Sequence, residues 1–126
     1  MIVGLGVDVV EIDRVRRLIA GPNERAIARL FTDAESRYAL ARADPATHLA
    51  ARVAAKEAAY KALAGNSLAR AVGWREIEVA LRDDGAPFLL LHGRAQQRAT
   101  ELEIARVLVS LTHSRTAAVA FVILER

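Results

Sequence analysis

Only two lysines occur among the 126 residues of this chain, Lys56 and Lys61, and both lie close to Glu57 in the segment ARVAAKEAAYKAL. The other basic side chains are sixteen arginines. A lysine ammonium is a compact point charge, whereas the arginine guanidinium is a planar fork. Lysines kept in an arginine-rich chain therefore indicate a task such as placing one charge beside a phosphate, and we expect the chemistry of the chain near them.

The carboxylates of Glu57 and Asp8 can lie close to the Lys61 ammonium. Glu57 and Lys61 are four residues apart, which puts them on one face of a helix. Asp8 lies in a Val-rich and Ile-rich segment whose alternation places it on the same face as Gly4 and Gly6, with room beside it for a ligand or another backbone. Two carboxylates from separate elements match the partly protein-held, all-oxygen coordination of Mg²⁺. The ammonium would neutralise charge on a phosphate leaving group.

A simpler interpretation stays open for the same residues. Glu57 and Lys61 could form an ordinary ion pair on a helix surface, worth about 0.2 to 0.5 kcal/mol. Asp8 could cap the turn that follows its strand. His113 ends a predicted strand and serves either as a structural hydrogen-bonding group or as a ligand contact.

Several classes of site are excluded by residue types and spacing. The chain has no cysteine, so it has no disulfide, thiolate metal site or cysteine nucleophile. No two histidines have zinc-site spacing. There is no Gly-rich phosphate loop followed by Lys and Ser or Thr, and the Gly4-Leu5-Gly6 segment lacks the third glycine of a dinucleotide fingerprint.

Composition predicts a compact domain with a basic surface. Hydrophobic residues make up 53% and charged residues 26% of the chain, with 5% aromatic, so the core is built from small aliphatic side chains. The pI is about 9.9, and the clusters at 14–17 and 25–29 predict a face that binds an acidic partner, either nucleic acid or an acidic protein. The apolar run at 1–10 is too short for a signal peptide or membrane span, so we expect a cytoplasmic protein with no membrane contact.

The elements that position these residues can be predicted from periodicity. The first half is predicted to be a strand over 1–10 followed by helices. The first helix covers 12–19 and ends at Gly21-Pro22, and the second is capped by Asn23 and runs to Leu30. A third helix is opened by a Thr32 capping box and runs to about Ala43, and a long Ala-rich helix is opened by Asp44 or Thr47 and ends before Gly65.

The second half is mostly extended: strands 75–81 and 87–92 around an Asp83-Asp84-Gly85 turn, a helix over 94–103, and strands 106–112 and 117–124 joined across 113–116. We therefore expect a single α+β domain, 1–126, with a mainly antiparallel sheet packed against the long Ala-rich helix.

Four motifs in order resemble the holo-acyl-carrier-protein synthase family of small bacterial 4'-phosphopantetheinyl transferases. The motifs span nearly the whole chain: GVDVVEI at 6–12, RVAAKEA at 52–58 with KAL at 61–63, GAP at 85–87, and SLTHS at 110–114. The departures are Val53, where the family commonly has Phe, and Thr112, where Ser is frequent. Neither removes a group that the chemistry needs.

The resemblance implies transfer of 4'-phosphopantetheine from coenzyme A to a serine of apo acyl carrier protein, with release of adenosine 3',5'-bisphosphate, in support of fatty acid biosynthesis. It implies that Asp8 and Glu57 hold Mg²⁺ and that Lys61 lies at the phosphates, these three being the catalytic residues. Whether Glu57, Asp8 through a water molecule or neither group deprotonates the serine stays open.

The resemblance also implies contacts with coenzyme A and with partner proteins. The residues expected at the nucleotide are Arg52, Gly85, Pro87, Thr112 and His113, together with Lys61 at the phosphates. The family implies a homotrimer with active sites between subunits. Arg14 and Arg17, on the helix that follows Asp8, are expected to bind an acidic carrier protein, whereas Arg16 is read as a solubilising surface residue.

Two other functions compete with this one. A basic module that binds nucleic acid would explain the pI and the arginine clusters, and would bind polyanions in a salt-dependent way without Mg²⁺ or coenzyme A. The few aromatic residues show no stacking pattern, so we expect no nucleic-acid partner. A catalytically inactive relative of the transferases would be stabilised by coenzyme A without turnover.

Overall fold

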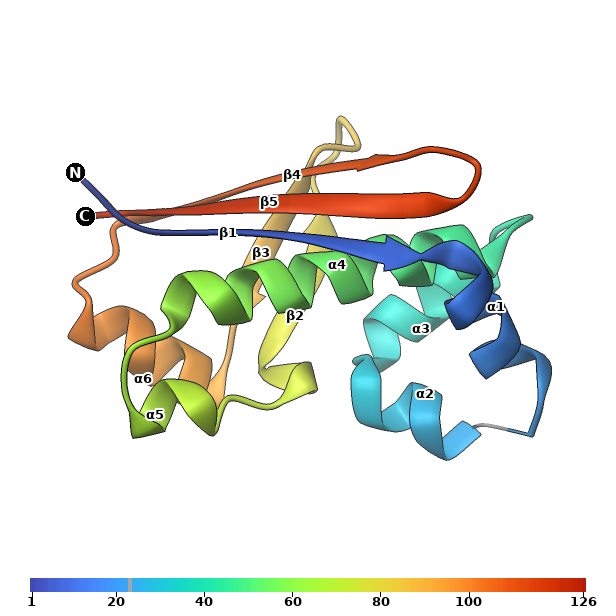
Figure 1. Ribbon diagram of the computed structural model, residues 1–126, viewed down its shortest axis with the longest axis horizontal. Helices are drawn as coiled ribbons and strands as arrows, with labels where there is room; N and C mark the ends of the chain where they lie inside the picture. Colours follow the sequence, from blue (N-terminus) through green and yellow to red (C-terminus); the bar gives the residue numbers. More distant parts are fainter. Residues whose placement is uncertain (23) are drawn as a thin grey trace.

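The structure is a computed structural model that describes residues 1–22 and 24–126, and it contains helices and strands in both halves of the chain (Figure 1). In chain order they are β1 (Ile2–Glu11), α1 (Ile12–Ala20), α2 (Glu24–Leu30), α3 (Asp33–Leu40), α4 (Pro45–Leu63), α5 (Ser67–Arg70), the 3₁₀ helix η1 (Trp74–Glu76), β2 (Ile77–Leu81), β3 (Pro87–Leu91), α6 (Gly93–Glu101), β4 (Arg106–His113) and β5 (Ala117–Glu125).

The strands form two antiparallel sheets, which confirms the predicted α+β class. One sheet has the order β1-β5-β4 and the other is the β2-β3 hairpin. Helix α4 runs along one face of the three-stranded sheet, while α1, α2 and α3 gather at one end of α4 and α5 and α6 at the other (Figure 1). Asp8 pairs with Ala120 of the central strand, so the strand carrying this carboxylate is held along its length.

Two glycines of β1 allow α4 to pack directly on the strand. A Cβ atom on Gly4 would collide with the backbone carbonyl oxygen of Ala62, and one on Gly6 with that of Ala58. The helix face in this contact carries alanines that are fully or almost fully buried. The sequence predicted space beside Asp8 for a ligand or another backbone. At Gly4 and Gly6 the backbone of α4 fills this space.

A buried ion pair joins α4 to α3 and to the hairpin. The Lys56 Nζ atom lies 2.8 Å from Glu35 Oε1, and both side chains are almost completely excluded from solvent. Lys56 also donates to the backbone oxygens of Trp74 and Ile77, so each of its three protons has an acceptor. The sequence drew attention to both lysines, and the structure shows that protein acceptors engage Lys56 completely.

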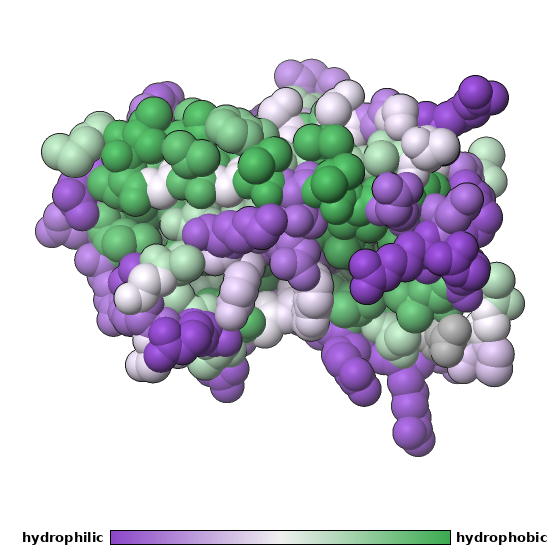
Figure 2. Space-filling model, viewed as in Figure 1, coloured by the Kyte–Doolittle hydropathy of each residue, from purple (hydrophilic) through white to green (hydrophobic). Residues whose placement is uncertain are grey.

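The other face of the three-stranded sheet is apolar and exposed. Its large side chains are 39% to 61% exposed: Leu5, Val7, Val9, Leu108 and Phe121. The registers place Val7 beside Phe121, and Phe121 beside Ser110 of β4. In Figure 2 apolar side chains gather along the upper edge of the molecule, over β1 and its neighbouring strands. An apolar face of this kind is typical of a protein interaction site.

Several predicted boundaries differ from the structure. Helix α3 ends at Leu40 rather than near Ala43, with Ala41 as its C-cap, and the chain leaves the helix in a tighter turn in which the Arg42 N–H donates to the backbone oxygen of Ala39. The prediction that Asn23 caps α2 lies outside the described residues. Asp44 flanks α4, but its carboxylate accepts from Arg16 and Thr47 side chains instead of capping the backbone.

The hairpin strands are also shorter than predicted. Arg75 and Glu76 belong to η1, because the Glu76 carboxylate accepts from the backbone N–H groups of Gly73 and Arg94 and holds the segment in a turn. His92 precedes α6 instead of ending β3. The short helix α5 was not predicted. Among residues 1–22 and 24–126, no helix has the length and apolar character that crossing a bilayer requires.

We expect Gly6→Ala to destabilise the protein by about 1 to 3 kcal/mol, because the new methyl group must displace the α4 backbone. Urea unfolding followed by circular dichroism measures this loss. Gly73→Ala is the control: its Cβ would meet only the end of the Glu76 side chain, at 3.2 Å, and we expect a smaller loss. Equal stability of wild type and Gly6→Ala would contradict the tight contact.

Candidate active site

Asp8 and Lys61 meet where β1 and α4 are in contact. The Lys61 Nζ atom lies 2.9 Å from Asp8 Oδ1 and also donates to the backbone oxygen of Val7, at 3.0 Å. The Asp8 side chain is 18% exposed and that of Lys61 52% exposed. The ammonium is therefore anchored on the strand while one side of it still faces solvent.

Glu57 lies close enough to Asp8 for the two negative charges to interact. Partial burial raises the pKa of the Glu57 carboxyl, the charge of Asp8 raises it further, and the Lys61 ammonium opposes the shift in part. In the part of the chain that the structure describes, no hydrogen bond or ion pair engages this carboxylate. The sequence-based prediction of two carboxylates and one ammonium in a small volume agrees with this geometry.

The two carboxylates suit a hard divalent cation whose coordination shell is completed by ligands from outside the protein. Asp8 and Glu57 supply carboxylate oxygens, and two like charges held together are stabilised by a cation between them. Residues 1–22 and 24–126 contain no group of three or more His, Cys, Asp or Glu that could hold a metal by themselves. Mg²⁺ fits this pattern because it usually keeps several water or phosphate oxygens in its coordination shell.

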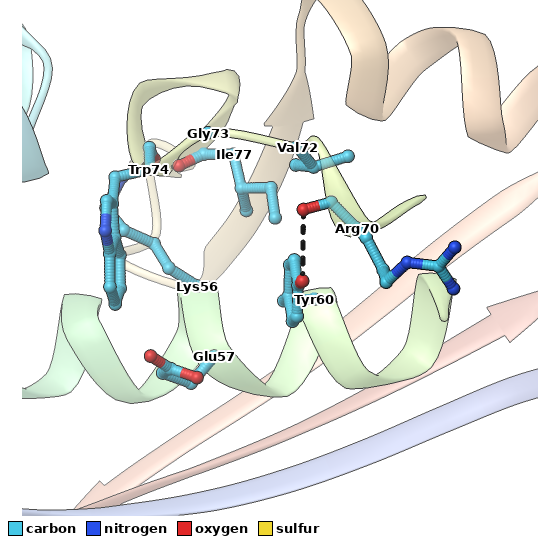
Figure 3. Close-up of a pocket in the computed structure, with 8 residues that line it drawn as sticks. All are labelled: Lys56, Glu57, Tyr60, Arg70, Val72, Gly73, Trp74 and Ile77. Carbon is cyan, nitrogen blue, oxygen red and sulfur yellow. Dashed lines mark hydrogen bonds between the residues drawn. The ribbon is translucent and has the colours of Figure 1, made fainter. Parts of the chain in front are cut away.

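A pocket of about 230 Å³ opens beside Glu57. It is lined by residues of α4 and of the segment that leads to β2: Lys56, Glu57, Tyr60, Arg70, Val72, Gly73, Trp74 and Ile77. Figure 3 shows Lys56 and Tyr60 rising from α4 toward that segment, while Glu57 lies apart on the other side of the helix ribbon. The Tyr60 hydroxyl donates to the backbone oxygen of Arg70, at 3.2 Å. The pocket lining therefore combines apolar and aromatic side chains with the charged residues Lys56, Glu57 and Arg70.

Arg52, which the resemblance places at the nucleotide, is buried in α4. It is 4% exposed, its guanidinium lies 4.6 Å from the centroid of the Tyr38 ring, and one nitrogen donates to the backbone oxygen of His48. Its Nε atom is buried without a partner. Five residues separate Arg52 from Glu57, which turns the two side chains to different sides of α4.

A cluster of cationic groups surrounds Tyr38 near the start of α4. Arg42 lies over the same ring, at 4.1 Å from its centroid. Burial lowers the pKa of His48, and the positive charges of Arg52 and Arg42 lower it further, while the charge of Asp44 opposes the shift. Arg42 follows α3 and Arg52 lies in α4, so two guanidinium groups meet at this corner of the molecule.

The other residues expected at the nucleotide lie elsewhere in the chain. Thr112 and His113 are exposed at the end of β4. Gly85 lies in the β2-β3 turn with φ of 88°, and Pro87 begins β3. Within the described ranges, no hydrogen bond or ion pair connects these four residues to Asp8, Glu57 or Lys61. A single chain brings together only part of the predicted set.

Arg14 and Arg17 are exposed on α1, which begins directly after the strand that carries Asp8. Arg16 differs from them because it forms a 2.8 Å ion pair with Asp44. Among the residues that the structure describes, neither Arg14 nor Arg17 has a carboxylate partner. Their positive charges are available to an acidic partner.

Sequence reasoning missed the residues that build the pocket. Tyr60 and Trp74 form its aromatic wall, and Glu35 holds Lys56 beneath it. The capping box drew attention to Glu35, but only as a local partner of Thr32. The single tryptophan of a chain poor in aromatic residues was the available signal for Trp74.

Comparison with known proteins identifies the relatives of this chain. The model of the 4'-phosphopantetheinyl transferase superfamily matches residues 4–122. A holo-[acyl-carrier-protein] synthase of Anaeromyxobacter dehalogenans is 51% identical over 99% of this chain and 97% of that protein. One from Geobacter sulfurreducens is 44% identical over 100% of this chain and 99% of that protein.

Solved structures of the same kind share the fold. The crystal structure of holo-[acyl-carrier-protein] synthase from Neisseria meningitidis superposes with a TM-score of 0.86, at 28% identity over the whole of both chains. The Bacillus anthracis enzyme, in complex with CoA (3',5'-ADP), has a TM-score of 0.78 at 32% identity, over 98% of this chain and 96% of that one.

The raised pKa of Glu57 predicts that its charge destabilises the fold at neutral pH. The folded state holds this proton more tightly than the unfolded state, so stability is lost as pH rises through the folded pKa. We expect Glu57→Gln to have a higher melting temperature than wild type at pH 7, with a difference that shrinks below pH 4.5. Calorimetry across this pH range, without divalent cations, measures the difference.

Glu101→Gln serves as the matched control. Hydrogen bonds from Asn66 and Arg98 lower the pKa of Glu101, so its charge stabilises the fold and its removal should lower the melting temperature at pH 7. If Glu57→Gln also lowered the melting temperature at pH 7, the electrostatic account of Glu57 would be wrong.

Proposed function

This chain belongs to the 4'-phosphopantetheinyl transferase superfamily, and we propose that it is a holo-[acyl-carrier-protein] synthase. It transfers 4'-phosphopantetheine from coenzyme A to a serine hydroxyl of an apo acyl carrier protein and releases adenosine 3',5'-bisphosphate. The observation that carries the proposal is the meeting of Asp8, Glu57 and Lys61 in a chain that matches such synthases over its full length. A cytoplasmic location and a role in fatty acid synthesis belong to the same proposal.

The reaction exchanges one phosphorus–oxygen bond for another. The serine oxygen bonds to the phosphorus that carries pantetheine, the bond to the second phosphate breaks, and the serine proton is released. Asp8 and Glu57 would hold Mg²⁺, which when bound neutralises charge on the pyrophosphate. Lys61 is anchored by Asp8 and Val7 and presents its remaining proton to a phosphate oxygen. Positioning and charge neutralisation are what phosphoryl transfer needs most.

The pocket beside Glu57 is the place that we propose for the pantetheine arm. Its lining includes Glu57, which would face the pyrophosphate, and apolar and aromatic groups such as Val72, Trp74 and Tyr60. This placement supports transfer from coenzyme A over transfer from a substrate that lacks the arm.

The nucleotide end of coenzyme A is assigned to residues that do not meet Asp8, Glu57 and Lys61 within a single chain. We propose that Thr112 and His113 at the end of β4 contact it, together with Gly85 and Pro87 at the hairpin. Arg52 would contribute its charge from beneath the Tyr38 ring, within the cationic corner. Because no hydrogen bond or ion pair among the described residues links these groups to Asp8 or Glu57 within one chain, we propose that each site combines residues of neighbouring subunits.

The exposed apolar face of the three-stranded sheet supports a homotrimer. Burying Leu5, Val7, Val9 and Phe121 against other copies would remove large apolar groups from water. Light scattering should then give three times the chain mass of 13.7 kDa, and a monomer at all concentrations would exclude the shared site.

The transfer itself is tested by intact-mass measurement. Incubation with coenzyme A, Mg²⁺ and several apo carrier proteins should add the mass of phosphopantetheine to at least one carrier, and chelation of the metal should stop the reaction. We expect Asp8→Asn and Glu57→Gln to lower the rate by about 100-fold or more. Glu103→Gln, which alters an exposed carboxylate, should leave the rate unchanged.

The outcomes separate the competing functions. Absence of any mass addition on every carrier tried would count against a transferase. Thermal stabilisation by coenzyme A without turnover would indicate an inactive relative instead.

Arg14 and Arg17 are tested through the carrier protein. We expect the Arg14→Glu and Arg17→Glu double variant to raise the KM for apo carrier protein about tenfold at low salt, because the complementary charge is reversed. The KM for coenzyme A should stay the same, as measured in steady-state assays at varied salt. Arg16→Gln is the control, since Arg16 is already paired with Asp44. If Arg16→Gln raised the KM for apo carrier protein equally, Arg14 and Arg17 could not be assigned as the residues that bind the carrier.

A further inference from the structure

We propose that Lys56 is a positioning residue for the transfer reaction, acting through Glu35 and the wall of the pocket beside Glu57. The Glu35–Lys56 pair fixes the segment from Trp74 to Ile77 relative to α4, and so sets where the pantetheine arm lies relative to Asp8 and Glu57. This inference rests on the proposed function and adds to it a residue that the transfer chemistry does not itself use.

The contacts of the Lys56 ammonium all point inward. Its Nζ atom donates to Glu35 Oε1 at 2.8 Å, to the backbone oxygen of Trp74 at 3.0 Å and to that of Ile77 at 2.5 Å. The side chain is 1% exposed. With all three protons used and no solvent access, the ammonium has no capacity left for a phosphate or a pantetheine oxygen. Its effect on a substrate must therefore pass through its partners.

Those partners form one wall of the pocket. Trp74 and Ile77 both line it, at the two ends of the segment that Lys56 holds. The opposite wall belongs to α4, where Glu57 and Tyr60 follow Lys56 by one and four residues. Figure 3 shows Lys56 spanning the space between the helix and this segment. Lys56 thus links the two walls at one end of the pocket, and the hydrogen bond from Tyr60 to Arg70 links them at another place.

Glu35 keeps the ammonium in place from the other side. Its Oε1 atom also accepts from the backbone N–H of Thr32, and its Oε2 atom accepts from that of Val79, both at 2.9 Å. The carboxylate therefore joins the start of α3, the middle of α4 and β2 in one buried network. Buried charges must be paired and hydrogen-bonded to be tolerated, and here both are.

This role explains why the position is a lysine in an arginine-rich chain. Three acceptors arranged around one point suit a compact ammonium with three donors. A planar guanidinium presents its donors as a wide fork and needs more space. The geometry accounts for Lys56 without any phosphate contact, and leaves that task to Lys61.

The test compares two ligands that differ in the arm. Coenzyme A carries pantetheine, whereas adenosine 3',5'-bisphosphate does not. We expect Lys56→Met combined with Glu35→Gln, which removes both buried charges together, to weaken coenzyme A binding about tenfold in calorimetric titrations. Binding of adenosine 3',5'-bisphosphate should change less than about twofold. In transfer assays the KM for coenzyme A should rise, with the KM for carrier protein unchanged.

Lys56→Met alone is the second variant, because the Glu35 carboxylate that it leaves behind keeps its hydrogen bonds from the backbone N–H groups of Thr32 and Val79. It should show the same selective loss, and it decides the question if the double variant does not fold. Arg75→Ala is the matched control: Arg75 lies in the same η1 segment, but it is exposed and pairs with Asp33 at the surface. It should leave both affinities unchanged.

The alternatives give different results. Equal weakening of the binding of both ligands, or no weakening, in a folded Lys56→Met variant would overturn the positioning role while leaving the proposed function intact. A wild-type chain that neither binds coenzyme A nor modifies a carrier would overturn the proposed function and this inference with it.

Discussion

The direct contact between β1 and α4 is the constraint on which the candidate site depends. Because Gly4 and Gly6 have no side chains, the helix backbone rests on the strand, and the next residue on the same strand face, Asp8, meets Lys61. Any larger residue at the glycines would move the helix and separate the charged groups. The alanines of α4 serve the same end, since short side chains let the helix lie close to the sheet. The same contact between β1 and α4 thus builds the core and positions the charged groups of the candidate site.

The two lysines divide two tasks that the sequence could not tell apart. Lys61 lies at the edge of the contact, where one carboxylate and one carbonyl oxygen leave part of its ammonium open to solvent. Lys56 lies beneath the pocket and is fully engaged. The two lysines lie on different sides of α4. Lys61 can therefore meet a substrate, whereas Lys56 holds the walls of the pocket. Glu57, between them in sequence, faces Asp8.

Local spacing predicted much of the fold and of the site. Alternation in β1 predicted the shared face of Gly4, Gly6 and Asp8, and the four-residue step predicted the shared face of Glu57 and Lys61. What the sequence did not predict depends on contacts between distant segments. The partner of Lys56 is 21 residues away on another helix, and the burial of Arg52 follows from the aromatic ring that α3 places over it. Neither relation leaves a periodic signal in the chain.

Helix α2, next to the arginines of α1, has no buried residue, whereas most of α4 is buried. Amide hydrogens in the middle of α4 should therefore exchange with deuterium only when the whole molecule unfolds, while those of α2 exchange through small local openings. The end of the molecule beside the basic surface can adjust to the shape of an arriving protein at little energetic cost. The tightly packed strand and helix that hold the carboxylates keep their geometry while it does so.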